Sequence, residues 1–230
     1  MLGIYKLVRK TGSIIIPEFV RRRYRLQYRV FELKLAHTFG NVVSERIIEY
    51  PWILEQLKHV PKSSSILDVG CGQGASIVHY LQNSGYQSTQ GIDILINRSV
   101  PNIWYLHNTN ILKNSYQDGI FDVVILLSTL EHIGSDESRD DFRTIDEIHR
   151  ILRKNGLLLF TTPYFPIYRN NGQRFYSSDR LDSLFKDKFQ TIKVSYYTRN
   201  KTDWVEGKLT SSDYKGLDAI SVIFMRLKKT

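Results

Sequence analysis

Short apolar runs alternate with segments of helical periodicity over most of the chain, from residue 61 onward. Runs of strand-forming residues predict strands at 65–69, 87–92, 103–106, 121–127, 157–162, 191–197 and 219–227. Apolar residues three and four positions apart predict helices at 75–83, 139–154 and 178–186. This alternation predicts an α/β fold, in which a mainly parallel sheet carries helices on both faces.

The first 60 residues have a different pattern and contain two predicted helices. Residues 19–36 contain no Gly or Pro, and their apolar side chains recur at helical spacing. A second helix is expected at 44–58, in which Pro51 should cause a kink or a restart. We therefore expect a basic N-terminal arm with helices at 1–60 and one α/β domain at 61–230.

Basic residues are concentrated in the first part of the arm. Residues 1–34 carry nine Lys or Arg against two Glu, which places +7 of the net charge of +9 there. Arg21, Arg25 and Arg29 recur every four residues, so they would line one helix face. This face is a candidate docking surface for an anionic membrane, a phosphorylated substrate or RNA. The pattern also fits a solvated helix that packs on the protein through its apolar side, and both interpretations stay open.

Cysteine content and hydropathy limit the cellular compartments in which this protein is expected. The single cysteine, Cys71, rules out an internal disulfide, and no Cys/His cluster has the spacing of a zinc site, so no metal is expected. No apolar run approaches the roughly 18 residues of a membrane span. The N-terminus also lacks the continuous apolar region of a signal peptide. A cytoplasmic protein is expected, with peripheral membrane contact through residues 1–34 as a further option.

Glycines directly follow the first predicted strand of the domain, in the sequence Asp68-Val69-Gly70-Cys71-Gly72-Gln73-Gly74. Glycine allows a sharp turn and lets a ligand approach the backbone without meeting a Cβ. Asp93 ends the next strand about twenty residues later, where a carboxylate can accept from ribose hydroxyls. The spacing G-x-G-x-G differs from the G-x-G-x-x-G of dinucleotide-binding folds, which disfavours a nicotinamide dehydrogenase.

Several segments together resemble the motifs of class I S-adenosylmethionine-dependent methyltransferases of the type 11 group: 68–74, 91–93, 121–124 with 128–133, and 150–156. The resemblance covers about residues 62–165. It implies a Rossmann-like, doubly wound sheet of seven mainly parallel strands with an antiparallel C-terminal strand. The family usually has a Gly pair before its fifth strand, where this chain has Asn155-Gly156.

The resemblance also implies S-adenosyl-L-methionine as the cofactor, in a pocket built from Asp68, Gly70, Cys71, Gly72, Gly74 and Asp93. Family members often place an Asp after the third strand, where it accepts from the adenine amino group. Asn110 stands there in this chain, and its carbonyl could accept the same hydrogen bond. Turn formation is the alternative role for Asn110.

Candidate catalytic groups lie just after the fourth predicted strand. His132 falls on the ligand-binding edge, where it would act as a general base or contact the acceptor. A structural histidine or a contact on the cofactor side is the alternative. Cys71 is not expected to act as the nucleophile of pyrimidine C5 methylation. Such a cysteine belongs on a separate loop that faces the pyrimidine, and no such loop is evident here. Residues 128–131 read Ser-Thr-Leu-Glu and lack the Asn/Asp-Pro-Pro-aromatic tetrad of adenine methyltransferases.

Aromatic and polar residues crowd the segment 164–179, which leaves the fifth predicted strand on the same edge. We expect it to form the acceptor wall, with Tyr164, Arg174 and Tyr176 as substrate contacts. Two further segments, Glu49-Tyr50-Pro51-Trp52 and Arg174-Phe175-Tyr176 with Asp179, together resemble a poorly characterised methyltransferase subgroup, some of whose members lie near glycan-biosynthesis functions. The favoured acceptor is therefore a polar or anionic small molecule, preferably a sugar or glycan hydroxyl. The alternatives are an RNA methyltransferase that uses the basic arm, and a non-catalytic nucleoside-binding scaffold.

Overall fold

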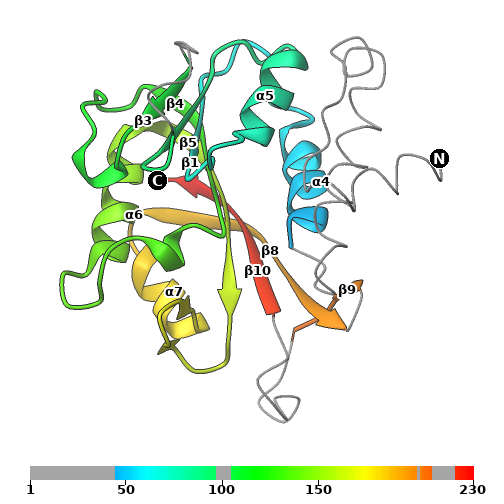
Figure 1. Cartoon of the computed structure of the whole chain (residues 1–230), viewed down its shortest axis with the longest axis vertical. Coiled ribbons are helices and arrows are strands. Elements are labelled where there is room, and N and C mark those ends of the chain that lie inside the picture. The colour runs from blue at the N-terminus through cyan, green and yellow to red at the C-terminus, as the bar shows by residue number, and fades with distance from the viewer. Residues whose placement is uncertain (1–44, 97–104, 201–202, 209–220) are drawn as a thin grey trace, which may run out of the picture. The chain divides into compact units, whose positions relative to one another are not determined.

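Eight strands form the central sheet in the computed structural model, which describes residues 45–96, 105–200, 203–208 and 221–230 (Figure 1). Their order across the sheet is β3 (Leu106–Asn108), β2 (Thr89–Asp93), β1 (Ile66–Val69), β4 (Phe121–Leu127), β5 (Leu152–Tyr164), β10 (Ser221–Lys229), β8 (Phe189–Asn200) and β9 (Asp203–Glu206). Strands β1 to β5 are parallel, and β10 inserts antiparallel between β5 and β8. The mainly parallel sheet with an antiparallel C-terminal strand is confirmed.

The number of strands differs from the expected seven because β9 adds a short edge strand. It pairs only with the last four residues of β8, 197–200. The strand has only two apolar residues, of which Trp204 is buried and Val205 is exposed. Its sequence therefore lacks the longer apolar run that would predict a strand. Two further short strands, β6 (Arg169–Asn170) and β7 (Arg174–Phe175), form a separate hairpin after β5.

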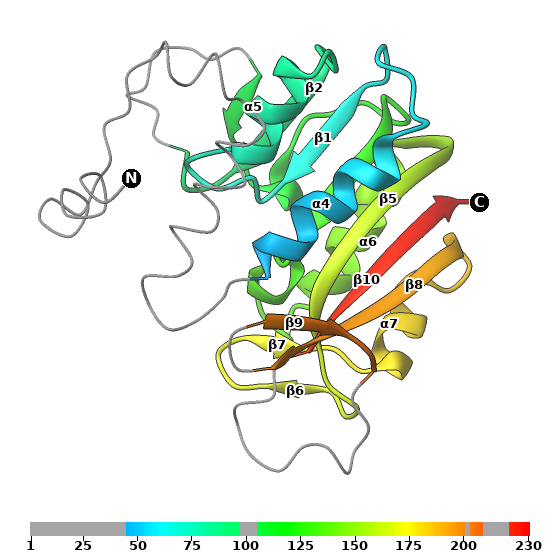
Figure 2. The same cartoon turned by 90° about the vertical axis from the view of Figure 1, so that its right-hand side faces the viewer.

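Helices cover both faces of the sheet, as predicted (Figures 1 and 2). On one face lie α4 (Arg46–Leu57) and α5 (Ser76–Asn83). On the other lie α6 (Asp140–Ile151) and α7 (Ser178–Phe185). Two 3-10 turns follow strand ends, η1 (Ile111–Lys113) and η2 (Leu130–His132). No helix among the described residues is both long and apolar enough to cross a membrane.

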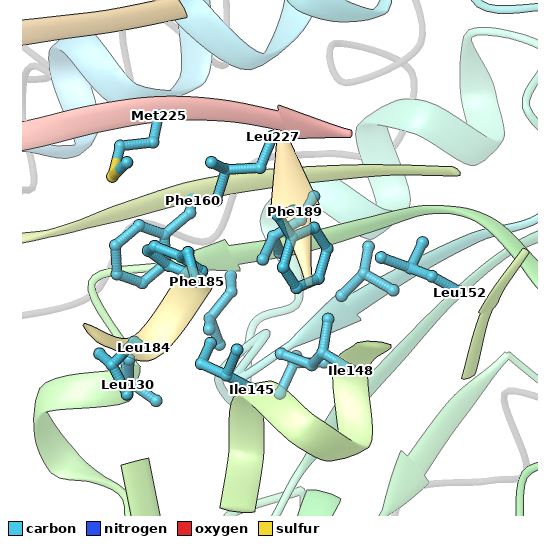
Figure 3. Close-up of a cluster of buried hydrophobic side chains, with 14 of the residues drawn as sticks. Leu130, Ile145, Ile148, Leu152, Phe160, Leu184, Phe185, Phe189, Met225 and Leu227 are labelled. Carbon is cyan, nitrogen blue, oxygen red and sulfur yellow. The ribbon is translucent and has the colours of Figure 1, made fainter. Parts of the chain in front are cut away.

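The main hydrophobic core lies between the sheet and the pair α6 and α7 (Figure 3). Side chains alternate across a strand, so Val124 and Leu126 of β4 point into this core while Val123 and Ile125 face the opposite layer. All of them are buried, because the two faces of the parallel strands are both covered. The buried central strands hold their carboxyl ends along one edge of the sheet.

The junction between α6 and β5 differs from the expected helix at 139–154. Helix α6 ends at Ile151, and β5 begins at once with Leu152. The pairing with β4 then shifts, because Phe121 faces Leu152 whereas Val123 faces Leu157. Residues 153–156 therefore form an irregularity within β5, where Asn155 has φ of 63°. The Asn155-Gly156 pair marks a real turn, but the turn lies inside the strand pairing rather than at a helix end.

Helix α4 runs through Pro51 without a break, so the expected restart is wrong, and the expected kink stays a prediction. The hydrogen bond that Pro51 cannot donate would go to the carbonyl of Ile47, close to the helix start, where its loss interrupts little. The chain divides into compact units at Met1–Ile47 and Ile48–Thr230. The domain boundary after residue 60 stays a prediction. The helix expected at 19–36 lies outside the described residues.

Candidate functional site

The glycine loop after β1 is tied to the end of β2 by three backbone donors. The N–H groups of Gly70 and Cys71 donate to the carbonyl of Ile92, over 2.8 and 3.2 Å. The N–H of Gly72 donates to Oδ2 of Asp93 over 2.8 Å. The structure therefore brings the predicted glycines and the predicted ribose acid together at the carboxyl edge of the sheet.

Gly70 and Gly72 both require the left-handed backbone, with φ of 76° and 69°. A Cβ on Gly70 would overlap the side chain of Thr129, which belongs to the loop after β4. A Cβ on Gly72 would meet no atom of the described residues within 4 Å. Gly70 is thus packed against protein, whereas Gly72 leaves open space beside the backbone, as a ligand-binding turn needs.

Cys71 lies beneath the loop rather than at its surface. A Cβ added to Gly91 of β2 would stand 2.9 Å from the Cys71 sulfur, which shows how closely the thiol packs on that strand. Burial, and after it the carboxylates of Asp68 and Asp93, raises the pKa of the Cys71 thiol well above its ordinary value. A thiol that stays protonated is a poor nucleophile, which agrees with the expectation from sequence.

Asp93 stabilises the glycine turn, and its carboxylate can still accept further hydrogen bonds. Its Oδ1 accepts from the N–H of Leu95 over 2.7 Å, and its Oδ2 accepts from Gly72. A carboxylate offers about four lone-pair sites, so each oxygen can accept one further hydrogen bond. Asp68, at the end of β1, is buried. Asn110 accepts from the N–H of Leu112 over 2.9 Å and caps η1, which is the alternative turn role, and its reading of the adenine amino group stays a prediction.

The loop after β4 begins with a left-handed residue, Ser128, whose φ is 38°. The hydroxyl of Thr129 donates to the carbonyl of Leu127 over 2.8 Å. His132 ends η2, and its backbone N–H donates to the carbonyl of Thr129 over 2.9 Å. The side chain of His132 is exposed on the edge that carries the glycine loop. A role as base or acceptor contact stays a prediction.

The three residues expected to form the acceptor wall are buried: Tyr164, Arg174 and Tyr176 are 3%, 1% and 0% exposed. Two backbone hydrogen bonds fold the chain back after β5. The N–H of Phe165 donates to the carbonyl of Tyr176, and the N–H of Tyr176 donates to the carbonyl of Pro163. This fold-back turns the side chains inward. Their role as substrate contacts stays a prediction.

Arg174 ties the hairpin to the loop that carries His132. Its Nε pairs with Asp136 over 2.6 Å, and its Nη1 donates to the carbonyls of Leu130 and Ile133 over 3.1 and 2.8 Å. Burial alone would raise the pKa of Asp136, but hydrogen bonds from Asn170, Tyr168 and Arg174 lower it to about 2. The contacts assign Arg174 a structural role in holding this loop.

Tyr176 is completely buried, and its hydroxyl has no hydrogen-bond partner among the described residues. Burial, and then the charge of Asp141, raises the pKa of this hydroxyl far above its ordinary value. Its ring belongs to the core between the sheet and helices α6 and α7. The side chain therefore stabilises the domain through its ring rather than through its hydroxyl.

The sequence singled out Glu49 only as part of the subgroup resemblance and gave it no role, whereas the structure shows a buried acid of α4 that reaches the end of β4. Its Oε1 accepts from the hydroxyl of Ser128 over 2.7 Å and from that of Thr161. The signal was present, because Glu49 stands in register with Trp52, Ile53 and the other buried positions of the helix. A charged residue on an apolar stripe marks a polar partner across the interface.

Within the described ranges, no group of three or more His, Cys, Asp or Glu residues is arranged to hold a metal ion.

Comparison with known proteins finds similarity to methyltransferases. A family model described as a methyltransferase domain matches residues 43–201. “Probable methyltransferase ltbC” of Aspergillus luteorubrus is 28% identical over 118 residues, 44% of this chain and 41% of that protein. The tRNA N(3)-methylcytidine methyltransferase trm140 of Schizosaccharomyces pombe is 26% identical over 128 residues, 49% of this chain and 40% of that protein. The chain spans about two fifths of the length of these curated relatives.

Among solved structures, the chain is similar to the 1,6-didemethyltoxoflavin-N1-methyltransferase of Burkholderia thailandensis. That structure holds bound 1,6-didemethyltoxoflavin and S-adenosylhomocysteine. The TM-score is 0.59 at 15% sequence identity, over 94% of this chain and 93% of that one. At this identity the likeness shows a common fold.

Replacing Asp136 tests the clamp around Arg174. Asp136→Asn should lower the free energy of unfolding at pH 7 by about 1.5–3 kcal/mol, because a buried guanidinium loses its charged partner. The folded pKa of Asp136, about 2, lies below the unfolded value of about 3.9. The stabilisation is therefore complete above about pH 4 and is lost as the pH falls toward 2. Urea unfolding of both proteins from pH 7 to 3 measures this. A difference in free energy of unfolding between the two proteins that stays constant below pH 4 would contradict this expectation.

Removing the Tyr176 hydroxyl should not destabilise the domain. The free energy of unfolding of Tyr176→Phe should be higher than that of the natural protein or lower by no more than about 1 kcal/mol, because no hydrogen bond is lost. The matched control is Tyr86→Phe, since the buried Tyr86 hydroxyl donates to the carbonyl of Leu57 over 2.7 Å. The control should lose about 1–2 kcal/mol. Equal losses for both variants in urea unfolding would show that the Tyr176 hydroxyl is bonded after all.

Proposed function

The chain belongs to the methyltransferase domain family, and from that premise we propose that it transfers the methyl group of S-adenosylmethionine to a polar small molecule. The observation that carries the proposal is the glycine loop. Gly72 leaves open space beside a left-handed turn, and the neighbouring Asp93 carboxylate keeps acceptor capacity. These features lie at the carboxyl edge of a parallel sheet, where such folds bind their ligands.

The residues present fit the chemistry of S-adenosylmethionine. Its ribose hydroxyls are donors, which suits the remaining lone pairs of Asp93. Asp68 supplies a second carboxylate beside the loop, and a positively charged sulfonium is favoured near negative charge. The Oδ1 atom of Asn110 caps η1 and keeps a second lone pair, so reading of the adenine amino group by this atom remains part of the proposal.

When bound, S-adenosylmethionine supplies an activated methyl group with a good leaving group. The protein then contributes mainly alignment and the exclusion of water. The packing of Thr129 against Gly70 sets the distance between the two loops of the edge. His132 follows three residues later on the exposed side, where it could remove a proton from a hydroxyl acceptor.

The acceptor we favour is a sugar or glycan hydroxyl. The exposed histidine supports an oxygen acceptor, because a hydroxyl gains from a general base whereas a neutral amine attacks unaided. RNA is the second candidate. It is supported by the +7 charge of residues 1–34 and by the match to the tRNA methyltransferase of S. pombe. Docking of the arm on an anionic membrane remains a proposal of the same kind.

Cofactor binding is tested by two glycine variants that share a left-handed backbone. Gly72→Ala places a Cβ in the open space, so the Kd for S-adenosylhomocysteine should rise about tenfold or more. Gly119→Ala is the matched control, with φ of 63° and its nearest atom at 3.8 Å, before β4 and away from the ligand edge. Both should lose about 1–2 kcal/mol of stability. Titration calorimetry that shows no binding to the natural protein would sink the proposal, and equal Kd values would exclude Gly72 from the site.

Replacement of His132 tests the role of the histidine. His132→Ala should lower turnover of a hydroxyl acceptor by about 10²-fold, the usual effect of losing a general base. The Kd for S-adenosylhomocysteine should stay the same, because the predicted cofactor contacts lie elsewhere. Transfer of labelled methyl groups to a panel of glycans, small hydroxyl compounds and tRNA provides the readout. Turnover on tRNA alone would favour the RNA reading, and none on any acceptor would favour a non-catalytic scaffold.

A further inference from the structure

The helix layer formed by α4 and α5 contains a buried acidic side chain, that of Glu49 (Figure 2). Glu49 of α4 is 0% exposed, although its neighbours on the same helix face include Trp52 and Ile53. Trp52 packs edge-on against Phe224 of β10, with ring centroids 5.3 Å apart, which shows that this face rests on the sheet (Figure 2). Burying an ionisable group is costly unless hydrogen bonds satisfy it, so its contacts should explain its presence.

The hydrogen bonds of Glu49 close a ring with the ends of β4 and β5. The backbone N–H of Ser128 donates to Oγ1 of Thr161 over 3.0 Å. The Thr161 hydroxyl donates in turn to Oε1 of Glu49, and the Ser128 hydroxyl donates to the same oxygen over 2.7 Å. One carboxylate oxygen thus holds both the backbone and the side chain of Ser128, from a helix 79 positions earlier in the chain.

The conformation that this ring holds is an unfavourable one. Ser128 has φ of 38°, in the left-handed region that non-glycine residues rarely adopt. Such a residue persists only where its surroundings over-determine it. Ser128 makes three hydrogen bonds to the other members of the ring: its hydroxyl donates to Glu49, and its N–H donates to both Oγ1 and the carbonyl of Thr161. Glu49 contributes to that determination, because it accepts from the hydroxyls of both Ser128 and Thr161.

The consequence reaches the glycine loop through the next residue. Thr129 follows Ser128 directly, and its side chain occupies the space where a Cβ of Gly70 would be. A change at Ser128 would therefore move Thr129 against, or away from, the turn that we propose binds the cofactor. These contacts form one continuous path from Glu49 through Ser128 and Thr129 to Gly70.

We propose that Glu49 is a positioning residue for this site: its carboxylate fixes the left-handed turn at Ser128 and so sets the distance between the loops after β1 and β4. The inference rests on the proposed function only for its effect on cofactor affinity. The effect on the loop itself stands independently of any ligand.

The first test compares loop order in variants of the full chain by hydrogen–deuterium exchange. Glu49→Leu and Thr161→Val each remove one corner of the ring, and amides of residues 128–133 should exchange about tenfold faster or more in both. Ile53→Val is the control, since Ile53 is fully buried on the same face of α4 and takes no part in the ring. Glu49→Gln keeps an oxygen acceptor and should restore most of the protection. If exchange in 128–133 is no faster than in the control, the proposal is wrong.

The second test measures the Kd for S-adenosylhomocysteine in the same proteins. Glu49→Leu and Thr161→Val should bind about tenfold more weakly than the control, and Glu49→Gln within about threefold of the natural protein. Faster exchange with an unchanged Kd would overturn the coupling to the cofactor site. Failure of the natural protein to bind would refute the proposed function, and the exchange measurement would still decide the role of Glu49. Should Glu49→Leu fail to fold, Thr161→Val carries both tests.

Discussion

The contact between Gly70 and Thr129 is the constraint on which the site depends. Two loops that leave neighbouring parallel strands touch so closely that the first has room only for glycine. Strands β1 and β4 are buried on both faces and paired in fixed register, so their ends cannot separate to relieve a misfit. Any group placed on either loop therefore keeps a defined distance from the other. A reaction that relies on alignment needs that property first.

Buried polar side chains from two elements hold the loop after β4. Glu49 of α4 accepts from the hydroxyl of Ser128 at the start of the loop. Arg174 of β7 donates to the carbonyls of Leu130 and Ile133 and pairs with Asp136. Buried ions are a costly way to gain stability, since apolar residues of similar size often serve as well. Their value here is directional, because each fixes particular loop atoms.

The sequence predicted the sheet and its covering helices because apolar periodicity reports burial directly. The same principle explains what could not be predicted. Glu49 and Thr161 meet across 112 residues, and no local pattern indicates which polar group will find a partner at that range. Arg174 and Tyr176 were expected to contact the acceptor because their segment leaves the fifth strand on the edge that carries the glycine loop, and the fold-back after β5 buries both side chains. The glycine motif was recognisable because its chemistry lies within one short segment.

The placement of these polar groups also bears on how acceptor specificity could arise. The residues expected to touch the acceptor are buried, and Arg174 holds the loop that carries His132. The loop that carries His132 packs on the glycine turn through Thr129 and on the hairpin through Arg174. A substitution in the hairpin would then alter the position of the histidine relative to the cofactor turn. Under the proposed function, one short loop contributes to both cofactor and acceptor geometry, so the two are not independent.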